Sequence, residues 1–302
     1  MLKKSTVLTS ERVSASLKTL IDLAQPATGL NLKRLSIRSS QSGGYVSRFK
    51  GRGMDFEESR MYQAGDDIRS IDWRVTARTG KTHTKVFREE RERPVFISVD
   101  NRAAMHFATR GVFKSVLAVK LAGLIAWAAQ HQGDRIGGQL FSDRHCSELK
   151  PQNGKHAVLR FLNTLANGNT VNTEAKSISL EQVLARLAQH AHSGSLVYII
   201  SDFRGINDAA ELHLAKLSRH CEVVLIFIYD ALESNLPTKG HYRFTDEHRD
   251  VVIDTNDSQR LSVYHQHFEE RLNHLQQLAK KRGFSFIQCS TVDNPIQCYD
   301  KI

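Results

Sequence analysis

Two aspartates, Asp100 and Asp202, stand where carboxylates could hold a metal ion or take part in acid–base chemistry. Each follows a short apolar run rich in β-branched residues, PVFISV before Asp100 and SLVYIIS before Asp202, which is typical of a buried strand. In a parallel sheet the carboxyl ends of the strands share one edge, and ligands commonly bind there. The sequence therefore predicts that these two carboxylates meet at one edge of a sheet.

A second concentration of charged side chains is the stretch YQAGDDIRSIDWRVTAR, residues 62–78. Its three aspartates could act as acids or bases, but no nucleophile accompanies them, and the nearby arginines would keep them ionised. Its arginines and Trp73 could contact phosphates and stack on bases. Residues 51–100, however, carry ten Lys/Arg against ten Asp/Glu, and a balanced segment attracts a polyanion poorly.

We favour a structural role for this stretch. AGDD predicts a tight turn, and the alternation in IRSIDW predicts a short strand. Aspartate–arginine pairs, with Trp73 packed beneath them, would fix the segment against the main sheet, since partly buried charges are usually paired. The residues assigned to this lock, which could also belong to a partner-binding surface, are Arg60, Tyr62, Asp66, Arg69, Asp72, Trp73 and Arg78.

One apparent nucleotide-binding motif is rejected. TGKT, residues 79–82, resembles the end of a phosphate-binding loop, but that loop needs a glycine five positions before Gly80, and Val75 stands there. The four cysteines show no C-x-x-C spacing, so reduced thiols are expected rather than a zinc or redox site.

Composition is that of a soluble globular protein, with 302 residues, 40% hydrophobic and 25% charged. No apolar run follows the N-terminal lysines, so we expect no signal peptide. The most apolar segment, residues 115–129, contains Lys120 and is shorter than the ~20 residues that span a bilayer. These features predict a cytoplasmic protein without a transmembrane segment.

The net charge of +10 is unevenly distributed. Residues 1–50 hold nine Lys/Arg against two acidic residues. Such a basic arm could bind nucleic acid or an anionic membrane surface, could dock on an acidic partner, or could simply be solvated, and we favour the last.

Strand-like and helical patterns alternate after Pro94, which predicts crossover units and a mostly parallel sheet with helices on both faces. Residues 145–150 could pair back on the strand at 135–141. Strands are expected at 94–100, 135–141, 195–201, 222–229 and 284–289, and helices near 111–132, 154–166, 180–192, from Asp208, and near 257–281. We therefore divide the chain into an N-terminal basic arm and β-rich signature subdomain, residues 1–93, with a helix at 11–25, and an α/β domain, residues 94–302.

Residues 51–92 resemble the signature of the bacterial family called "domain of unknown function 58". The positions that carry the resemblance are Gly51, Gly53, Phe56, Arg60, Tyr62, Gly65, Asp66, Arg69, Ile71, Asp72, Trp73, Ala77, Arg78, Lys85 and Glu90. A later string of that family also recurs as Asp230, Glu233, Leu236, Pro237 and Gly240.

The resemblance implies a von Willebrand factor A-like fold, which is α/β and doubly wound. Family members are often encoded beside MoxR-type AAA+ ATPases, which implies a partner of that kind and a role in the maturation or remodelling of another protein. The family's biochemical activity is not established.

Von Willebrand A-like domains often bind Mg²⁺ at a metal-ion-dependent adhesion site, whose first loop reads D-x-S-x-S. Here the loop reads DNRAA, so Asp100 is kept while Arg102 and Ala104 replace the serines. Thr170 and Asp202 align with the remaining ligands. Two oxygen ligands are lost and one is replaced by a cation, which disfavours a hard divalent ion. We expect a degenerate site in which the Arg102 guanidinium reaches Asp100 or Asp202 in place of the ion.

The function predicted from sequence is a non-enzymatic protein-interaction module whose contact face surrounds Asp100, Arg102, Thr170 and Asp202. Two alternatives stay open. One is a nucleic-acid or anionic membrane-surface binder that uses the basic arm, and the other is a binding domain or enzyme that depends on a divalent metal, Mg²⁺ or Mn²⁺. We expect no cofactor.

Overall fold

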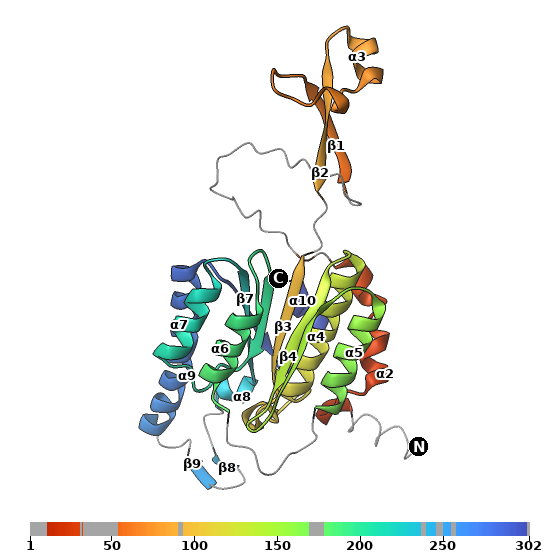
Figure 1. Ribbon diagram of the computed structural model, residues 1–302. Helices are drawn as coiled ribbons and strands as arrows, with labels where there is room; N and C mark the ends of the chain where they lie inside the picture. Colours follow the sequence, from red (N-terminus) through yellow and green to blue (C-terminus); the bar gives the residue numbers. More distant parts are fainter. Residues whose placement is uncertain are drawn as a thin grey trace. The chain divides into compact units, whose positions relative to one another are not determined.

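The computed structural model describes residues 11–30, 32, 54–89, 93–168, 178–236, 240–245, 250–254 and 258–300. The chain forms two compact units, Ser36–Glu92 and a larger unit made of Met1–Leu35 with Arg93–Ile302. Figure 1 follows the chain through both units.

The larger unit is built on a six-stranded sheet within the described residues, in the order β10-β7-β6-β3-β4-β5. The strands are β3 (Pro94–Asp100), β4 (Arg135–Phe141), β5 (Cys146–Gln152), β6 (Leu196–Ser201), β7 (Glu222–Tyr229) and β10 (Ser285–Ser290). Their pairings are parallel except for β5, which runs antiparallel to β4 at the edge. The chain adds β4 and β5 on one side of β3 and then β6, β7 and β10 on the other, so strand order reverses between β3 and β6.

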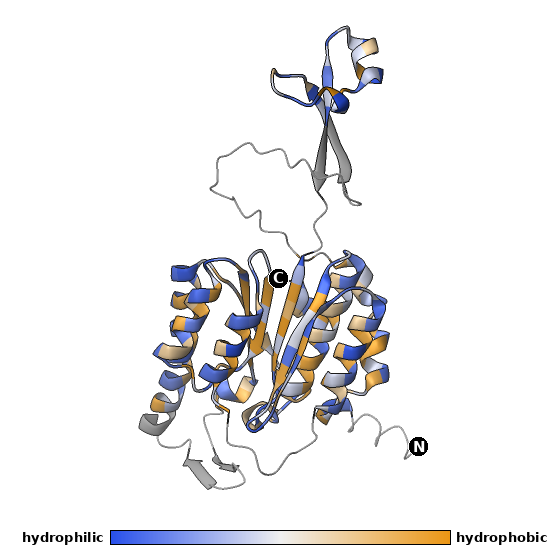
Figure 2. Cartoon of the chain, in the orientation of Figure 1, coloured by the Kyte–Doolittle hydropathy of each residue, from blue (hydrophilic) through white to orange (hydrophobic). Residues whose placement is uncertain are grey.

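Helices cover both faces of this sheet (Figure 1). One face packs against α4 (Lys114–His131), α5 (Lys155–Asn167) and α10 (Pro295–Tyr299), and α2 (Leu17–Asp22) packs on the outer side of α4 and α5. The other packs against α6 (Leu180–His190), α7 (Asp208–Leu217) and α9 (Ser258–Arg282). Figure 2 shows hydrophobic residues along the strands and polar residues on the outer sides of the helices. The α/β class predicted from sequence is confirmed, and the doubly wound order is the von Willebrand A-like arrangement that the resemblance implies.

Helix α4, which begins with Lys114, is almost wholly buried. Its side chains are therefore held in fixed positions against the sheet. Its residues from Lys114 to Ala129 are buried with the exception of Lys120, since α2, α5 and α10 cover the side that does not face the sheet. Gly123 lets α2 approach closely, because a Cβ there would lie 3.2 Å from a methyl group of Leu23. Trp127 fixes the same contact by donating from Nε1 to the backbone oxygen of Leu20 at 3.0 Å.

The division at residue 93 requires a correction for the start of the chain. Residues 11–30 belong with the α/β unit rather than with the signature subdomain, because Leu20 and Ala27 are fully buried in its core. The helix expected at 11–25 is also interrupted. Ser16 accepts a hydrogen bond from the Thr19 backbone and thereby begins a separate helix, α2.

The smaller unit contains an antiparallel pair, β1 (Met54–Met61) with β2 (His83–Glu89), joined through η2 (Ile68–Ser70) and α3 (Trp73–Thr79). The expectation of a strand at IRSIDW is wrong, since these residues lie mostly in the two short helices. The physical reason is capping: the Asp67 side chain accepts from the Arg69 backbone, and Asp72 accepts from two backbone N–H groups of α3. Helix α3 ends at Gly80, whose φ of 69° is the left-handed conformation that glycine adopts freely.

Short elements complete the described residues. They are η1 (Pro26–Gly29), η3 (Ala103–Met105), α8 (Ala231–Ser234), and a two-stranded pair of β8 (His241–Thr245) with β9 (Asp250–Asp254). Helix α8 follows β7 directly and therefore brings its side chains to the carboxyl edge of the sheet.

Candidate functional site

Asp100 ends β3 at the point where strand order reverses, and its carboxylate is fully buried. The guanidinium of Arg102 holds it in a bidentate pair, with Nη2 2.7 Å from Oδ2 and Nε 3.0 Å from Oδ1. The Arg102 backbone N–H donates to Oδ1 at 3.0 Å, and the Ser201 hydroxyl donates to Oδ2 at 2.6 Å. Both carboxylate oxygens are therefore engaged by donors from this chain.

Arg102 also links the ends of two neighbouring strands. Its Nη2 lies 3.7 Å from Oδ1 of Asp202, the residue that follows β6. Its Nη1 donates to the backbone oxygen of Arg204 at 3.0 Å, and its guanidinium lies over the Phe141 ring at 5.7 Å. The structure thus brings Asp100, Asp202 and Arg102 together at one edge of the sheet.

Lys114 supplies a second cation to the same cluster. Its Nζ donates to Asp202 Oδ2 at 3.0 Å and to Glu233 Oε1 at 2.8 Å, and its side chain is fully buried. Arg204 approaches from the solvent side, with Nη2 2.7 Å from Glu233 and Nε 3.4 Å from Asp202. Three carboxylates (Asp100, Asp202, Glu233) therefore meet three cations (Arg102, Lys114, Arg204). We call these six residues the ion-pair cluster.

The two strand-end carboxylates differ in their tendency to ionise. Burial raises the pKa of Asp100 above its ordinary value, even though the hydrogen bonds from Arg102 and Ser201 favour the charged form. Burial also opposes ionisation of Asp202, but Lys114 and the Arg204 backbone and guanidinium outweigh it and lower the pKa of Asp202. The charge of Asp202 is therefore the better stabilised of the two.

The loop after β6 is held in an uncommon backbone conformation. Phe203 has φ 52°, in the left-handed region that bulky residues rarely occupy, and Gly205 follows with φ 80°. The Ser201 hydroxyl accepts from the Phe203 backbone N–H at 2.8 Å, and Asp202 accepts from the Arg204 backbone N–H at 3.1 Å. These bonds fix the direction in which the Arg204 side chain leaves the loop.

Glu233 and Asp230 anchor the end of β7 to the cluster. They form a reciprocal capping box at the start of α8, in which Glu233 Oε2 accepts from the Asp230 backbone N–H at 3.1 Å. The buried Asp230 carboxylate accepts from the hydroxyls of Thr109 and Thr291, each at 2.6 Å. Burial opposes ionisation, but the bonds from the two threonines and from the Thr109 and Leu232 backbone lower the pKa of Asp230.

The residues present do not fit a divalent ion. The oxygens of Asp100 and Asp202 are engaged by Arg102, Ser201, Lys114 and Arg204, and Ala104 offers no side-chain oxygen. Thr170 lies outside the described residues. Within those residues, no cluster of three or more His, Cys, Asp or Glu side chains has a geometry suited to a metal.

The signature residues form ion pairs and caps within the smaller unit. Arg60 Nη2 lies 2.7 Å from Asp66 Oδ1, and this pair, with the Gln63 backbone, lowers the pKa of Asp66. Asp72 accepts from the Ser59 hydroxyl at 3.0 Å while it caps α3. The Tyr62 backbone N–H donates to the Thr82 oxygen at 2.9 Å.

Three other signature residues lie at the surface of this unit. The expectation that Trp73 packs beneath the ion pairs is wrong, because its side chain is 68% exposed at the first turn of α3. Arg69 and Arg78 are also exposed. Ile68 is 68% exposed as well, so apolar side chains are available to a contact from outside this unit.

Sequence reasoning missed Lys114, Arg204 and the pairing role of Glu233. Lys114 opens a mostly apolar helix, and a lysine at the start of a buried helix is the signal that could have indicated a buried partner. Glu233 belongs to the string that begins at Asp230, but nothing in that string indicates a lysine as its partner.

These observations define a class of protein: a doubly wound α/β domain whose carboxyl edge carries a cluster of paired charges, together with a small signature unit. The chain belongs to the family described as "Protein of unknown function DUF58", which matches residues 58–276. It is 29% identical over 238 residues to the uncharacterised proteins Rv1480 of Mycobacterium tuberculosis (strain ATCC 25618 / H37Rv) and Mb1516 of Mycobacterium bovis (strain ATCC BAA-935 / AF2122/97), with 76% of this chain and 74% of each relative covered.

Solved structures give weaker similarities. An aerotolerance-related membrane protein from Bacteroides fragilis superimposes with a TM-score of 0.47 at 15% identity, covering 70% of this chain and 96% of that chain. BatB from Bacteroides thetaiotaomicron gives 0.44 at 12% identity, covering 69% and 96%. Manganese-loaded TRAP protein from Plasmodium vivax gives 0.33 at 16% identity, covering 46% and 57%. In the described part of this chain, no helix is both long and apolar enough to cross a membrane.

Proposed function

We propose that this protein is a non-enzymatic interaction module and that the carboxyl edge of its sheet is the contact face. The observation that carries the proposal is the ion-pair cluster. Asp100, Asp202 and Glu233 are each paired with a cation of the same chain, so they serve poorly as general bases or metal ligands and well as fixed supports for the loops around them. Loops held on a rigid sheet commonly carry binding.

The partner that we propose is a MoxR-type AAA+ ATPase, with a role in the maturation or remodelling of a third protein. The support for this partner is the family to which the chain belongs, whose members are often encoded beside such ATPases. The support for the face is Arg204, whose side chain is 49% exposed although it is tied to Glu233 and Asp202. An exposed arginine held in one position is a favourable contact residue, because little side-chain entropy is lost on binding.

A binding titration between the purified chain and the MoxR-type ATPase of the same host tests this proposal. The wild-type chain should bind, and Arg204→Gln should weaken binding by about tenfold or more. Arg219→Gln is the matched control, since Arg219 is exposed after α7 and outside the cluster. Equal binding by the two variants would place the contact elsewhere, and the absence of binding by the wild-type chain would refute the partner.

The alternative based on the basic arm has no comparable support. Of residues 1–50, the structure describes only 11–30 and 32, where α2 and η1 pack on the α/β unit.

A further inference from the structure

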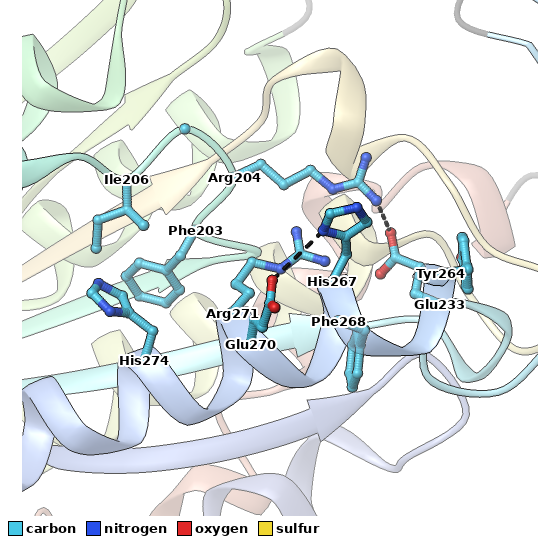
Figure 3. A pocket seen from close by; sticks show the side chains of 11 residues that line it. Phe203, Arg204, Ile206, Glu233, Tyr264, His267, Phe268, Glu270, Arg271 and His274 are labelled. Atoms are coloured by element: carbon cyan, nitrogen blue, oxygen red, sulfur yellow. Dashed lines mark hydrogen bonds and ion pairs between the residues drawn. The ribbon is translucent and has the colours of Figure 1, made fainter. Parts of the chain in front are cut away.

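A pocket of about 700 Å³ opens beside the ion-pair cluster, between the loop after β6 and helix α9. Its volume falls in the range of small-molecule and side-chain binding pockets. Phe203, Ile206, Phe268 and Tyr264 supply apolar or aromatic surface, and two arginines, Arg204 and Arg271, line it. Figure 3 shows that the arginines come from different elements, the loop and the helix.

Arg271 is the unusual member of this pocket. Its Nε is buried and, within the described part of the chain, has no hydrogen-bond partner. Its guanidinium lies 5.9 Å from the ring centres of both Phe227 and Phe268. Burial, followed by the charge of Arg204, lowers the pKa of Arg271. A buried donor without an acceptor is unfavourable and calls for a physical explanation.

The rim of the pocket is open to solvent. Its rim residues His267 and Glu270 are 75% and 59% exposed. Arg204, by contrast, is already paired with Glu233, whose carboxylate also lines the pocket. The guanidinium of Arg271 is therefore the one available to a ligand. The nearby carboxylates of Glu233 and Glu270 would repel a doubly charged phosphate more than a singly charged carboxylate.

We propose that this pocket binds an acidic side chain of a protein partner, presented next to an apolar residue, with the carboxylate on Arg271. A carboxylate matches the planar guanidinium of Arg271, which lines the pocket and whose buried Nε has no acceptor within the described residues. The aromatic surface takes the neighbouring apolar group. This inference rests on the proposed contact face and names the chemistry that the face recognises.

The test uses the full chain and two blocked dipeptides, N-acetyl-Phe-Glu amide and N-acetyl-Phe-Gln amide, which differ only in charge. The readout is the Nε–H resonance of Arg271 in a proton–nitrogen NMR spectrum, identified by its loss in Arg271→Met. The glutamate probe should shift this resonance in a saturable manner, and the glutamine probe should leave it unchanged. Equal shifts with both probes, or none with either, would overturn the proposal.

Two further comparisons separate binding from other roles of Arg271. Arg271→Met should weaken binding of the glutamate probe by about tenfold or more, whereas Arg282→Met, an exposed substitution on the same helix, should not. Arg271→Met should also keep or raise the thermal midpoint, because it removes an unpaired buried donor. A marked loss of midpoint would assign the guanidinium to structure and overturn the proposal.

A phosphate-containing probe and the ATPase titration complete the set of experiments. Phenyl phosphate should bind more weakly than the glutamate probe, and tighter binding would assign the pocket to a phosphate ligand instead. If the glutamate probe binds while the MoxR-type ATPase does not, the pocket assignment stands and the proposed partner fails. If the ATPase binds while the probe leaves Arg271 unaffected, the partner stands and the pocket assignment fails.

Discussion

Nζ of Lys114 lies 3.0 Å from Oδ2 of Asp202, and both side chains are buried. The same nitrogen lies 2.8 Å from Glu233, so one lysine pairs with two carboxylates, one that follows β6 and one in α8. This arrangement joins the end of β6 to the start of α8 beneath the solvent-facing Arg204.

Lys114→Met should lower the free energy of unfolding by about 3–5 kcal/mol, because it leaves Asp202 and Glu233 buried with one cation fewer. Chemical denaturation monitored by circular dichroism measures this. Lys120→Met is the control, since Lys120 lies on the same helix but is partly exposed, and it should cost less than about 1 kcal/mol. Similar losses in the two variants would mean that the buried pairing contributes little.

Asp100 and Arg102 should behave as one energetic unit. Either Asp100→Asn or Arg102→Met alone leaves an unbalanced charge or an unsatisfied donor in a buried place, whereas the double variant removes both. A double-mutant cycle from denaturation curves should therefore give a coupling energy of about 1–3 kcal/mol. Strict additivity of the two losses would contradict the bidentate pairing.

Fold prediction succeeded where the pattern of the sequence is local. PVFISV, LVYIIS and EVVLIFIY are short, mostly apolar runs rich in β-branched residues, which is typical of strands buried on both faces, and their alternation with helical patterns indicates a parallel sheet. The meeting of Asp100 with Asp202 follows from that topology. The partners Lys114 and Glu233 could not be predicted, because they reach the edge from α4 and α8, and their pairing depends on tertiary packing.

The signature segment shows a competing local effect. IRSIDW alternates as a strand does, yet Asp67 and Asp72 cap short helices, and capping by a local side chain outweighed the alternation. The expectation that Trp73 packs beneath the aspartate–arginine pairs is wrong because Trp73 occupies the first turn of α3, where its side chain is exposed.

Trp73→Ala should therefore leave the stability of the chain within about 0.5 kcal/mol of the wild-type value, because the side chain is 68% exposed. If this surface contributes to partner binding, the same variant should weaken binding of the MoxR-type ATPase. Aromatic side chains that become buried at an interface commonly contribute much of the binding energy, and truncating them removes it. Thermal unfolding and the binding titration measure the two effects separately. A large loss of stability would show that Trp73 is a packing residue.

Stability should depend on pH through Asp230. The pKa of Asp230 is lowered in the folded chain from a reference of 3.8, so its contribution is complete well above that value and is lost as pH falls through the lowered pKa. Asp230→Asn should therefore be less stable than wild type at about pH 7, and the difference should shrink towards about pH 3. Urea denaturation at both pH values measures it, and a difference independent of pH would contradict the assignment.

We propose that cations of the chain itself, Arg102 and Lys114, hold the carboxylates at the carboxyl edge of the sheet in place of a metal ion. A titration of Mg²⁺ into the chelator-treated wild-type chain, followed by thermal unfolding, tests it most directly. We predict a midpoint that does not change with Mg²⁺ beyond the general effect of ionic strength, measured in parallel with NaCl. A saturable rise of the midpoint that is specific to Mg²⁺ would show that the folded chain binds the ion and would refute its replacement by Arg102 and Lys114.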